Sequence, residues 1–486
     1  MAKYKDDLRE TYQMLDCTLE TLLPRDSVVR LIRKALDSLD FGEFDALYVN
    51  DDAGRTALDP RSLAGVWIYG MLRGVTSSVR LAALCAMDIE FRWLMCGQFV
   101  EKSTLCDFRK HRKEPLAALG AQVLGALGAE GLLPGENLGV DGSIVRAASS
   151  RHAVKSRRRL NAARQRLEDL LREKLSQPDA EPMAREIESL AARRRRIDRA
   201  LEAMDARGLD KDADRINTTE PDAGVKRQKD GSFAPGHNAQ AVSDLDTGVV
   251  VFAEIVEAGG DGGQLQPQID NALETLEALR ARGVLDTAAP DAIAAGADGA
   301  YHDTRQLEAM EGEGIACFVP DSRAANRLPP GVSPEYAADK FRFDAASGTM
   351  TCPEGQTLER RKLNADKTAE VYQADASACN ACPNKARCCP NTENGRSASR
   401  TLDEYQETLE AVSARVKSAQ GQRMKKARLV VCEGAFARLK ESLHWQRCRM
   451  WGKAGAEMEL LWRVLANNLM LLSGAWKPLA LARAAA

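Results

Sequence analysis

The stretch from residue 238 to residue 319 constrains the fold most, because strand and helix patterns alternate along it. Alternation along 238–244 and 249–256, on either side of the turn Asp246-Thr247-Gly248, predicts a β-hairpin. Apolar residues at helical spacing follow over 265–276. A strand over 291–298, a short helix over 304–310 and a strand over 314–319 complete the run. This order predicts an α/β fold with a mixed sheet flanked by helices.

Three acidic residues far apart in the sequence lie on or beside these elements. Asp141 lies within a β-branched segment, 137–145, that predicts a first strand, although Asp is unfavourable there and Asp-Gly is typical of a turn. Asp298 ends a later strand, and Glu433 is expected to start a late helix. Acids on neighbouring elements of a small sheet can meet at one edge. The alternative is that each is an ordinary surface acid.

A cluster of such acids has an electrostatic requirement. Two carboxylates about 4 Å apart repel each other by about 4 kcal/mol at an effective dielectric constant of about 20, so cations must neutralise the cluster. Hard oxygen ligands suit Mg²⁺ or Mn²⁺. Two such ions can flank a phosphodiester, one activating the attacking oxygen and one stabilising the leaving oxygen.

Residues 1–112 predict an all-α domain, because apolar residues recur at three- and four-residue spacing. A helix that Ser103 or Thr104 would cap carries Arg109 and Lys110 on its expected exposed face. This basic edge suits a DNA-binding or dimerisation module, and it suits the solvated face of a helical bundle equally well. Residues 113–136 predict a linker helix and a loop.

A second helical segment interrupts the α/β pattern over 151–210. Leucine and isoleucine faces predict two antiparallel helices, with a proline-containing turn at 177–182. Arginine runs at 157–159 and 193–196 indicate either a solvated face or contact with phosphates. The candidate DNA-binding residues of this insertion are Arg157, Arg158, Arg193 and Arg194.

The alternation of strand and helix patterns stops over residues 321–400, which contain five of the chain's 12 cysteines. The spacing predicts a small module with a tetrahedral Zn²⁺ site, because the segment lacks a dense apolar core that would stabilise it otherwise. Reduced thiols without a metal are the alternative, and Cys389 competes for the position of the fourth ligand. The candidate ligands are Cys352, Cys379, Cys382 and Cys388.

The overall charge restricts the kind of partner. Lys and Arg number 68 against 70 Asp and Glu, so a nucleic acid must be bound by local basic patches. No run of apolar residues is long enough to span a membrane, and the charged start is unlike a signal peptide. We therefore expect a cytoplasmic protein without a membrane partner.

Several segments, taken in order, resemble bacterial insertion-sequence transposases of the DDE class. Residues 141–143 resemble the segment with the family's first acid, and 220–240 resemble the run before its hairpin. Residues 297–301 resemble the second acid, and 432–436 with Lys440 resemble the third. The resemblance implies a ribonuclease-H-like core, formed by 137–320 and completed by 401–486. Relatives often carry Arg four residues before the third acid, where this chain has Leu429 beside Arg428.

The resemblance also implies an activity. Asp141, Asp298 and Glu433 would bind two Mg²⁺ or Mn²⁺ ions, cleave double-stranded DNA at the element's ends and join the 3′-OH ends to target DNA. Lys440 would contact a DNA phosphate or be an ordinary solvated lysine. A homodimer that associates with the nucleoid while it acts, and a structural zinc in the cysteine module, are further implications.

Two other functions remain compatible with the sequence. One is a domesticated transposase that binds DNA without catalysis. The other is a metal-dependent nuclease that cuts DNA without joining the ends.

Overall fold

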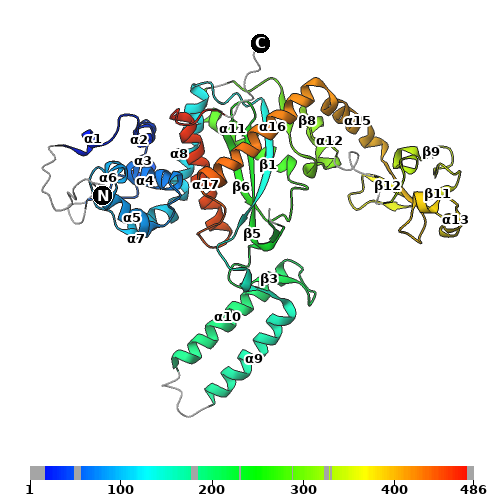
Figure 1. Ribbon diagram of the computed structural model, residues 1–486, viewed down its shortest axis with the longest axis horizontal. Coiled ribbons are helices and arrows are strands. Elements are labelled where there is room, and N and C mark those ends of the chain that lie inside the picture. Colours follow the sequence, from blue (N-terminus) through cyan, green and yellow to red (C-terminus); the bar gives the residue numbers. More distant parts are fainter. Residues whose placement is uncertain are drawn as a thin grey trace, which may run out of the picture.

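The computed structural model describes residues 17–48, 56–176, 184–228, 231–286, 288–321, 328 and 331–478. Its centre is a mixed sheet of six strands (Figure 1). The strand order is β4-β5-β1-β7-β8, and β6 also pairs with β5. The strands are β1 (Asn137–Arg146), β4 (Gly224–Arg227), β5 (Phe233–Asp244), β6 (Val250–Val256), β7 (Ile293–Gly296) and β8 (Ile315–Phe318). The predicted mixed sheet is therefore confirmed.

Strand β1 lies between an antiparallel and a parallel neighbour. Asp141 is opposite Ala241 of β5, and Gly139 is opposite Gly296 of β7. The predicted strand over 291–298 is shorter in the structure, because β7 ends at Gly296 and Asp298 follows it.

Helices cover both faces of this sheet. On one face, α16 (Ala419–Ala437) packs across β1, β5, β7 and β8 through a small apolar cluster that includes Met424, Val431 and Cys432. On the other face lie α11 (Leu265–Ala281) and α17 (Gly452–Leu472), which contact β5 and β6 (Figure 1). The short α12 (Thr304–Gly312) precedes β8.

The described part of 1–112 is helical, as expected. Its helices share one apolar core with the sheet, because Phe108 packs its ring against Trp462 of α17. The Trp462 Nε1 also donates to the Arg109 carbonyl at 3.2 Å. The helices are α1 (Leu19–Leu22), α2 (Val28–Asp37), α3 (Gly42–Asp45), α4 (Pro60–Leu72), α5 (Ser78–Met87), α6 (Ile89–Leu94) and α7 (Lys102–Lys110). Helix α8 (Lys113–Ala129) follows them, in the segment 113–136 where a helix and a loop were expected.

The predicted helical hairpin projects from the sheet as an arm (Figure 1). It consists of α9 (Arg157–Leu175) and α10 (Ala184–Ala206) on a base made of η1 (Arg151–Ala153), β2 (Val154–Ser156) and β3 (Arg215–Asn217). A separate apolar cluster that includes Leu160, Leu201 and Met204 holds the hairpin together. The predicted turn at 177–182 lies outside the described residues.

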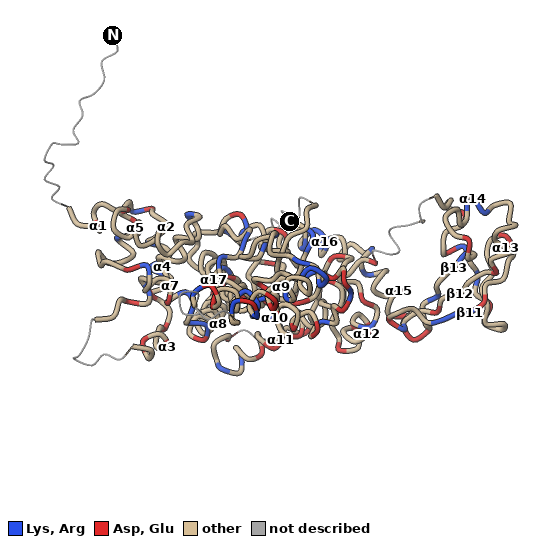
Figure 2. The backbone as a smooth tube through the Cα atoms, turned by 90° about the horizontal axis from the view of Figure 1, so that it is seen from below, with Lys and Arg blue, Asp and Glu red and all other residues tan. Residues whose placement is uncertain are grey.

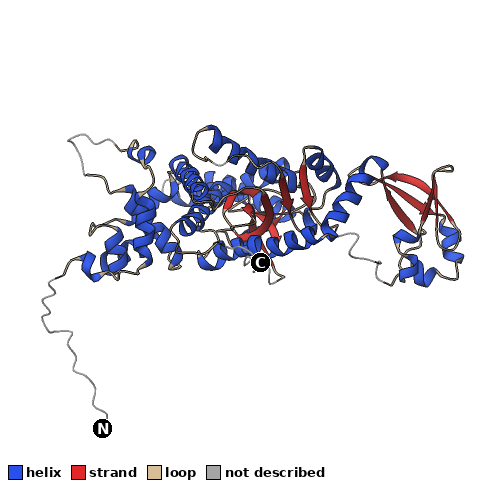
Figure 3. Cartoon of the chain, turned by 90° about the horizontal axis from the view of Figure 1, so that it is seen from above, coloured by secondary structure: helices blue, strands red, loops and turns tan. Residues whose placement is uncertain are grey.

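The cysteine-rich segment forms a separate body at one end of the molecule (Figure 3). It has a five-stranded antiparallel sheet in the order β13-β12-β11-β10-β9. The expectation that it lacks an apolar core is wrong, because Leu358, Met350 and Tyr372 form a buried core there. Each short strand contributes only one or two apolar residues, which sequence density does not reveal. The elements are η3 (Pro334–Tyr336), η4 (Ala338–Lys340), β9 (Arg342–Asp344), β10 (Thr349–Thr351), β11 (Thr357–Leu363), β12 (Ala369–Ala374), α13 (Ala376–Ala381), α14 (Lys385–Cys388) and β13 (Ser397–Thr401).

The C-terminal segment differs from expectation at one point that bears on the site. Helix α15 (Asp403–Lys417) leads into α16, so Glu433 lies near the end of a helix instead of its start. A π-helical turn, η5 (Arg438–Ser442), follows. It changes the direction in which its side chains point, compared with a continuing α-helix. None of the helices in the described ranges is long and apolar enough to cross a membrane.

Candidate functional site

The face of β1 that carries Asp141 lies under helix α16. Side chains alternate along a strand, so Gly139, Asp141 and Ser143 share this face. A Cβ atom on Gly139 would lie 2.6 Å from the Cys432 Sγ, which shows how closely α16 approaches the strand. The absence of a side chain at Gly139 therefore allows the helix to bring Glu433 toward Asp141.

Asp141 is half-buried, and its charge is affected by its neighbours. Burial, and to a smaller extent the charges of Asp298 and Asp261, raise the pKa of Asp141 to about 6. The Gly142 N–H and the Arg428 guanidinium oppose this rise. Arg428 of α16 thus places positive charge near Asp141, although Leu429 occupies the position where relatives often have Arg.

The other two acids approach from different elements. Asp298 caps η2 (Gly299–Tyr301), and its Oδ1 accepts a hydrogen bond from the Ala300 N–H at 2.8 Å. Glu433 is exposed on α16, next to the buried Cys432. Among the described residues, no group of three or more His, Cys, Asp or Glu side chains is arranged so that it could hold a metal ion. The charge of Asp298 acts on Asp141, and Glu433 lies on α16, the helix that packs across β1 and β7.

The opposite face of β1 holds a polar network that sequence reasoning missed. A Cβ atom on Gly142 would lie 2.5 Å from the Asp261 Oδ1 and 2.9 Å from the Tyr301 hydroxyl. The Gln240 Nε2 donates to Asp261 at 2.9 Å, and the Gln240 Oε1 accepts a hydrogen bond from the Tyr301 hydroxyl. The glycine in the Asp141-Gly142 pair is thus needed for a close approach inside a strand, not for a turn. The one sequence feature that marks Asp261 is the glycine-rich run around it, 259–263.

Lys440 is neither solvated nor on the face expected for a continuous helix. Its side chain is 7% exposed, and its Nζ donates to the Ser143 Oγ and, at 2.7 Å, to the Ile144 carbonyl. The π-helical turn directs Lys440 inward, against the strand that carries Asp141. Lys440 therefore fixes η5 to β1.

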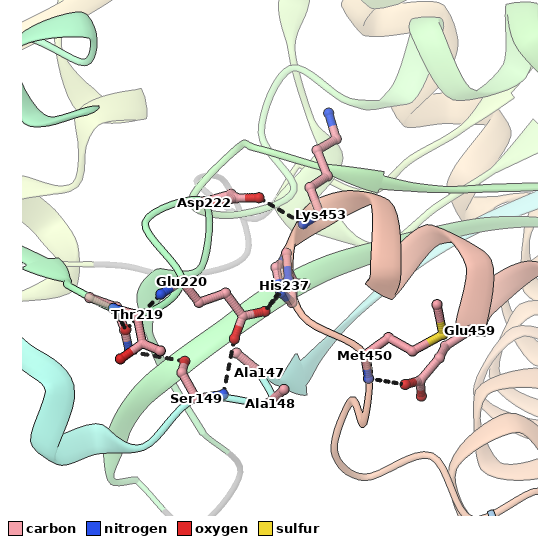
Figure 4. A network of polar contacts seen from close by, with 12 residues as sticks. Ala147, Ala148, Ser149, Thr219, Glu220, Asp222, His237, Met450, Lys453 and Glu459 are labelled. Atoms are coloured by element: carbon pink, nitrogen blue, oxygen red, sulfur yellow. Dashed lines mark hydrogen bonds and ion pairs between the residues drawn. The ribbon is translucent and has the colours of Figure 1, made fainter. Parts of the chain in front are cut away.

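A buried hydrogen bond between Glu220 and His237 joins the base of the arm to the sheet (Figure 4). The Glu220 Oε1 lies 3.0 Å from the His237 Nε2 and accepts from the Gly452 N–H at 2.9 Å. Its other oxygen accepts from the Ser149 N–H at 2.9 Å. Burial by itself raises the pKa of Glu220, but the hydrogen bonds from His237 and Ser149 outweigh burial and lower it.

The candidate DNA-binding residues of the arm divide into two kinds. Arg157 pairs with Asp205, and Arg194 lies 3.0 Å from Glu168, so both stabilise the hairpin itself. Arg158 and Arg193 are exposed. Helix α16 adds further exposed cations, Arg423, Lys425 and Lys426. Figure 2 shows where Lys and Arg occur along the chain, in blue.

The candidate residues of the N-terminal domain also separate. Lys110 is exposed, as expected. Arg109 is not on an exposed face, because its guanidinium stacks 4.5 Å from the centre of the Trp67 ring and donates to the Thr76 carbonyl. Periodicity within α7 cannot show that two other helices, α4 and α17, cover Arg109 at this end of α7.

Five cysteines line one cavity of about 20 Å³ in the cysteine-rich segment. The Cys352 Sγ accepts a hydrogen bond from the Gln356 N–H at 3.3 Å, and the Cys379 Sγ accepts one from the Arg396 N–H at 3.4 Å. Burial, together with the adjacent Cys389, raises the pKa of the Cys388 thiol to about 12. The cavity is too small for an organic ligand.

Comparison with known protein families defines the class. The family described as Transposase DDE domain matches residues 351–473, and the Transposase domain (DUF772) matches residues 17–111. The first match includes Glu433, while Asp141 and Asp298 lie outside both. No curated protein and no solved structure matches the chain.

Both matching families are transposase domains, and they lie at opposite ends of the chain in the order that the resemblance predicts. The two matches together support an insertion-sequence DDE transposase. Transposases of this kind act on DNA, and DDE transposases generally use divalent metal ions.

Proposed function

We propose that this protein binds the ends of its mobile element, cleaves the DNA there and joins the 3′-OH ends to target DNA. The observation that carries the proposal is the placement of three acids around one strand. Asp141 lies on the central strand β1, and Asp298 directly follows its parallel neighbour β7. Glu433 lies on α16, which packs over both strands. The mixed sheet is compatible with the proposed ribonuclease-H-like core.

The chemistry of these side chains fits hard divalent cations, because all three offer carboxylate oxygens. When bound, two Mg²⁺ or Mn²⁺ ions would activate the attacking oxygen and stabilise the leaving oxygen of a phosphodiester. In this proposal Asp141, Asp298 and Glu433 would hold the two ions. Lys440 acts as a positioning residue that holds β1 against η5, instead of contacting DNA directly.

The test is cleavage of supercoiled and linear DNA that carries the element's ends, with Mg²⁺ or Mn²⁺. We expect the wild-type protein to yield 3′-OH ends and joined products. Glu433→Gln is expected to lower the cleavage rate by roughly a hundredfold or more, because it removes a carboxylate that would hold a metal ion at the cleaved bond, while DNA binding stays intact.

Glu407→Gln on the exposed side of α15 is the matched control, because it makes the same chemical change away from the site. It is expected to cleave like the wild type. If all three proteins bind DNA and none cleaves it, the protein is a non-catalytic DNA-binding protein. Cleavage without joined products would identify a nuclease that lacks strand transfer.

We also propose a structural zinc ion in the cysteine-rich segment. Four thiolates suit tetrahedral zinc, and backbone N–H groups already donate to the sulfurs of Cys352 and Cys379. Cys382 and Cys388 would complete the set, with Cys389 as the competitor of Cys388. One equivalent of zinc per chain in the purified protein would support the proposal, and protein that folds without zinc would contradict it.

The remaining proposals concern assembly and DNA contacts. A homodimer is proposed because a transposase must hold two DNA ends, and light scattering of the purified protein in solution tests it. Arg158, Arg193 and Lys110 are proposed to contact phosphates, because their side chains are exposed. Arg157, Arg194 and Arg109 are proposed to support the fold around these contacts.

A further inference from the structure

The arm carries a large groove that is separate from the three acids. The groove has a volume of about 1630 Å³. Residues of α9 and α10 form its two sides, and the base strands β2 and β3 close one end. Val225 of β4 and Phe233 of β5 also reach it, and Phe233 is 66% exposed. We refer to this feature as the arm groove.

The arm groove concentrates positive charge in a chain whose net charge is −2. Eight of its described lining side chains are Lys or Arg, and Asp212 is the one acid among them. Five described acids of the hairpin pair with cations that do not line the groove, namely Arg157, Arg172, Lys174 and Arg194. Within the described ranges, no ion pair neutralises a cation of the groove. Such a surface suits a ligand with many negative charges.

The placement of these cations indicates a polymer with regularly spaced charges. Arg158, Arg159 and Arg166 lie along α9, and Arg193 and Arg196 face them from α10. Axes of packed helices are about 8–10 Å apart, which is comparable with the groove widths of B-DNA, roughly 6 and 12 Å. Two rows of arginines at this separation can contact phosphates on both strands of a duplex.

The arm groove is too far from Asp141 to contact the cleaved bond. Both lie along β5, because Phe233 begins this strand and Ala241 is the partner of Asp141. These two positions are eight residues apart, which at about 3.3 Å per residue corresponds to about 26 Å. A B-form duplex rises about 3.4 Å per base pair, so it must extend about eight base pairs from the cut to reach the groove.

We propose that the arm groove binds the phosphate backbone of duplex DNA about eight or more base pairs away from the cleaved bond. The inference rests on the proposed function in taking DNA as the partner. It adds the site, its residues and the minimum length of duplex that engages it. Recognition is through phosphates, so the site is expected to bind duplexes of any sequence.

The test compares two double variants that remove the same charge from the same two helices. Arg166→Ala with Arg193→Ala changes the arm groove. Arg164→Ala with Arg195→Ala removes exposed arginines that do not line it. Binding of a fluorescein-labelled 40-base-pair duplex of arbitrary sequence is measured by anisotropy over a series of salt concentrations, without divalent metal. Equal melting temperatures of the two variants verify that both fold.

We expect the groove variant to bind roughly tenfold or more weakly than the control variant. The slope of log affinity against log salt concentration is expected to fall by about 1.8, since each lost phosphate contact removes about 0.9. Equal weakening in the two variants would overturn the proposal, because it would reflect net charge alone. A changed oligomeric state with unchanged DNA affinity would also overturn it and indicate a protein partner.

The binding assay needs no catalysis, so its failure can be told apart from failure of the proposed function. Groove-dependent binding by a protein that never cleaves DNA would support this inference and contradict the catalytic proposal. Where cleavage occurs, substrates with four or sixteen base pairs beyond the cut provide a second test. The groove variant is expected to slow cleavage of the long substrate only. Equal slowing of both lengths would contradict the proposed position of the groove.

Discussion

Glu220 shows how one residue can hold several segments together. Its carboxylate is 2% exposed and contacts His237 of β5, Ser149 before the arm and Gly452 at the start of α17. The hydrogen bonds lower the pKa of this carboxyl below its ordinary value of 4.5, despite burial. A group whose pKa is lowered in the folded state stabilises the protein above its unfolded pKa. This stabilisation is lost as the pH falls through the folded pKa.

We predict that Glu220→Gln lowers the stability of the protein by about 1–3 kcal/mol at pH 7, since an uncharged amide replaces a buried, hydrogen-bonded charge. The difference from the wild type should shrink as the pH falls below 4.5, where the unfolded carboxyl also takes up a proton. Thermal unfolding over a pH series measures it. Glu407→Gln, which changes an exposed acid, should be neutral throughout. A difference that stays constant with pH would show that the charge of Glu220 is not what stabilises the junction.

At the scale of elements, the corner between α15 and α16 sets the position of the helix that carries Glu433. Ser418 caps α16 by accepting from the Gly421 N–H at 3.0 Å. A Cβ atom on Gly421 would lie 2.3 Å from the Arg415 carbonyl oxygen and 2.4 Å from that of Val416. Both atoms belong to the backbone, so a side chain at Gly421 requires the two helices to separate.

We predict that Gly421→Ala destabilises the protein by about 1–3 kcal/mol through overpacking. It should also lower cleavage by roughly tenfold or more, because a small displacement of a catalytic group is costly. The control is Gly120→Ala in α8, where a Cβ atom meets nothing within 4 Å. The control should be neutral or stabilising by up to about 1 kcal/mol. Thermal unfolding and the cleavage assay measure both variants, and equal behaviour would show that the corner does not position Glu433.

At the scale of the whole molecule, the cysteine-rich segment has a core of its own. The apolar cluster that contains Leu358 and Tyr372 is separate from the large cluster shared by the sheet and the N-terminal helices. A small body with few apolar residues gains much of its stability from a bound metal. Loss of the metal should therefore affect this segment more than the rest.

We predict that a zinc chelator makes residues 331–401 sensitive to proteolysis while the remaining chain stays resistant. Limited proteolysis with identification of the fragments by mass spectrometry measures this. Cys382→Ser should have the same effect without a chelator, and Cys17→Ser, at an exposed cysteine outside the cluster, should not. Resistance of the segment in the chelated protein would contradict a structural zinc.

Much of this architecture is determined by local patterns in the sequence. Alternation and turn residues determine the hairpin of β5 and β6, and helical periodicity determines the arm. Both patterns depend only on neighbours within a few residues, so each segment can be predicted from its own sequence. The acids at 141 and 298 were found for the same reason, because each interrupts or ends a strand pattern.

Only the tertiary structure decided what depends on distant contacts. Lys440 turns inward because η5 packs on β1, and Arg109 is covered because Trp67 and Trp462 come from helices far away in the sequence. Asp261 joins the site through Gln240, which no spacing along the chain reveals. Tertiary packing also decides which arginines of the arm line the groove and which form ion pairs within the hairpin. Sequence specifies which side chains are present, but their burial and partners arise only where separate elements pack together.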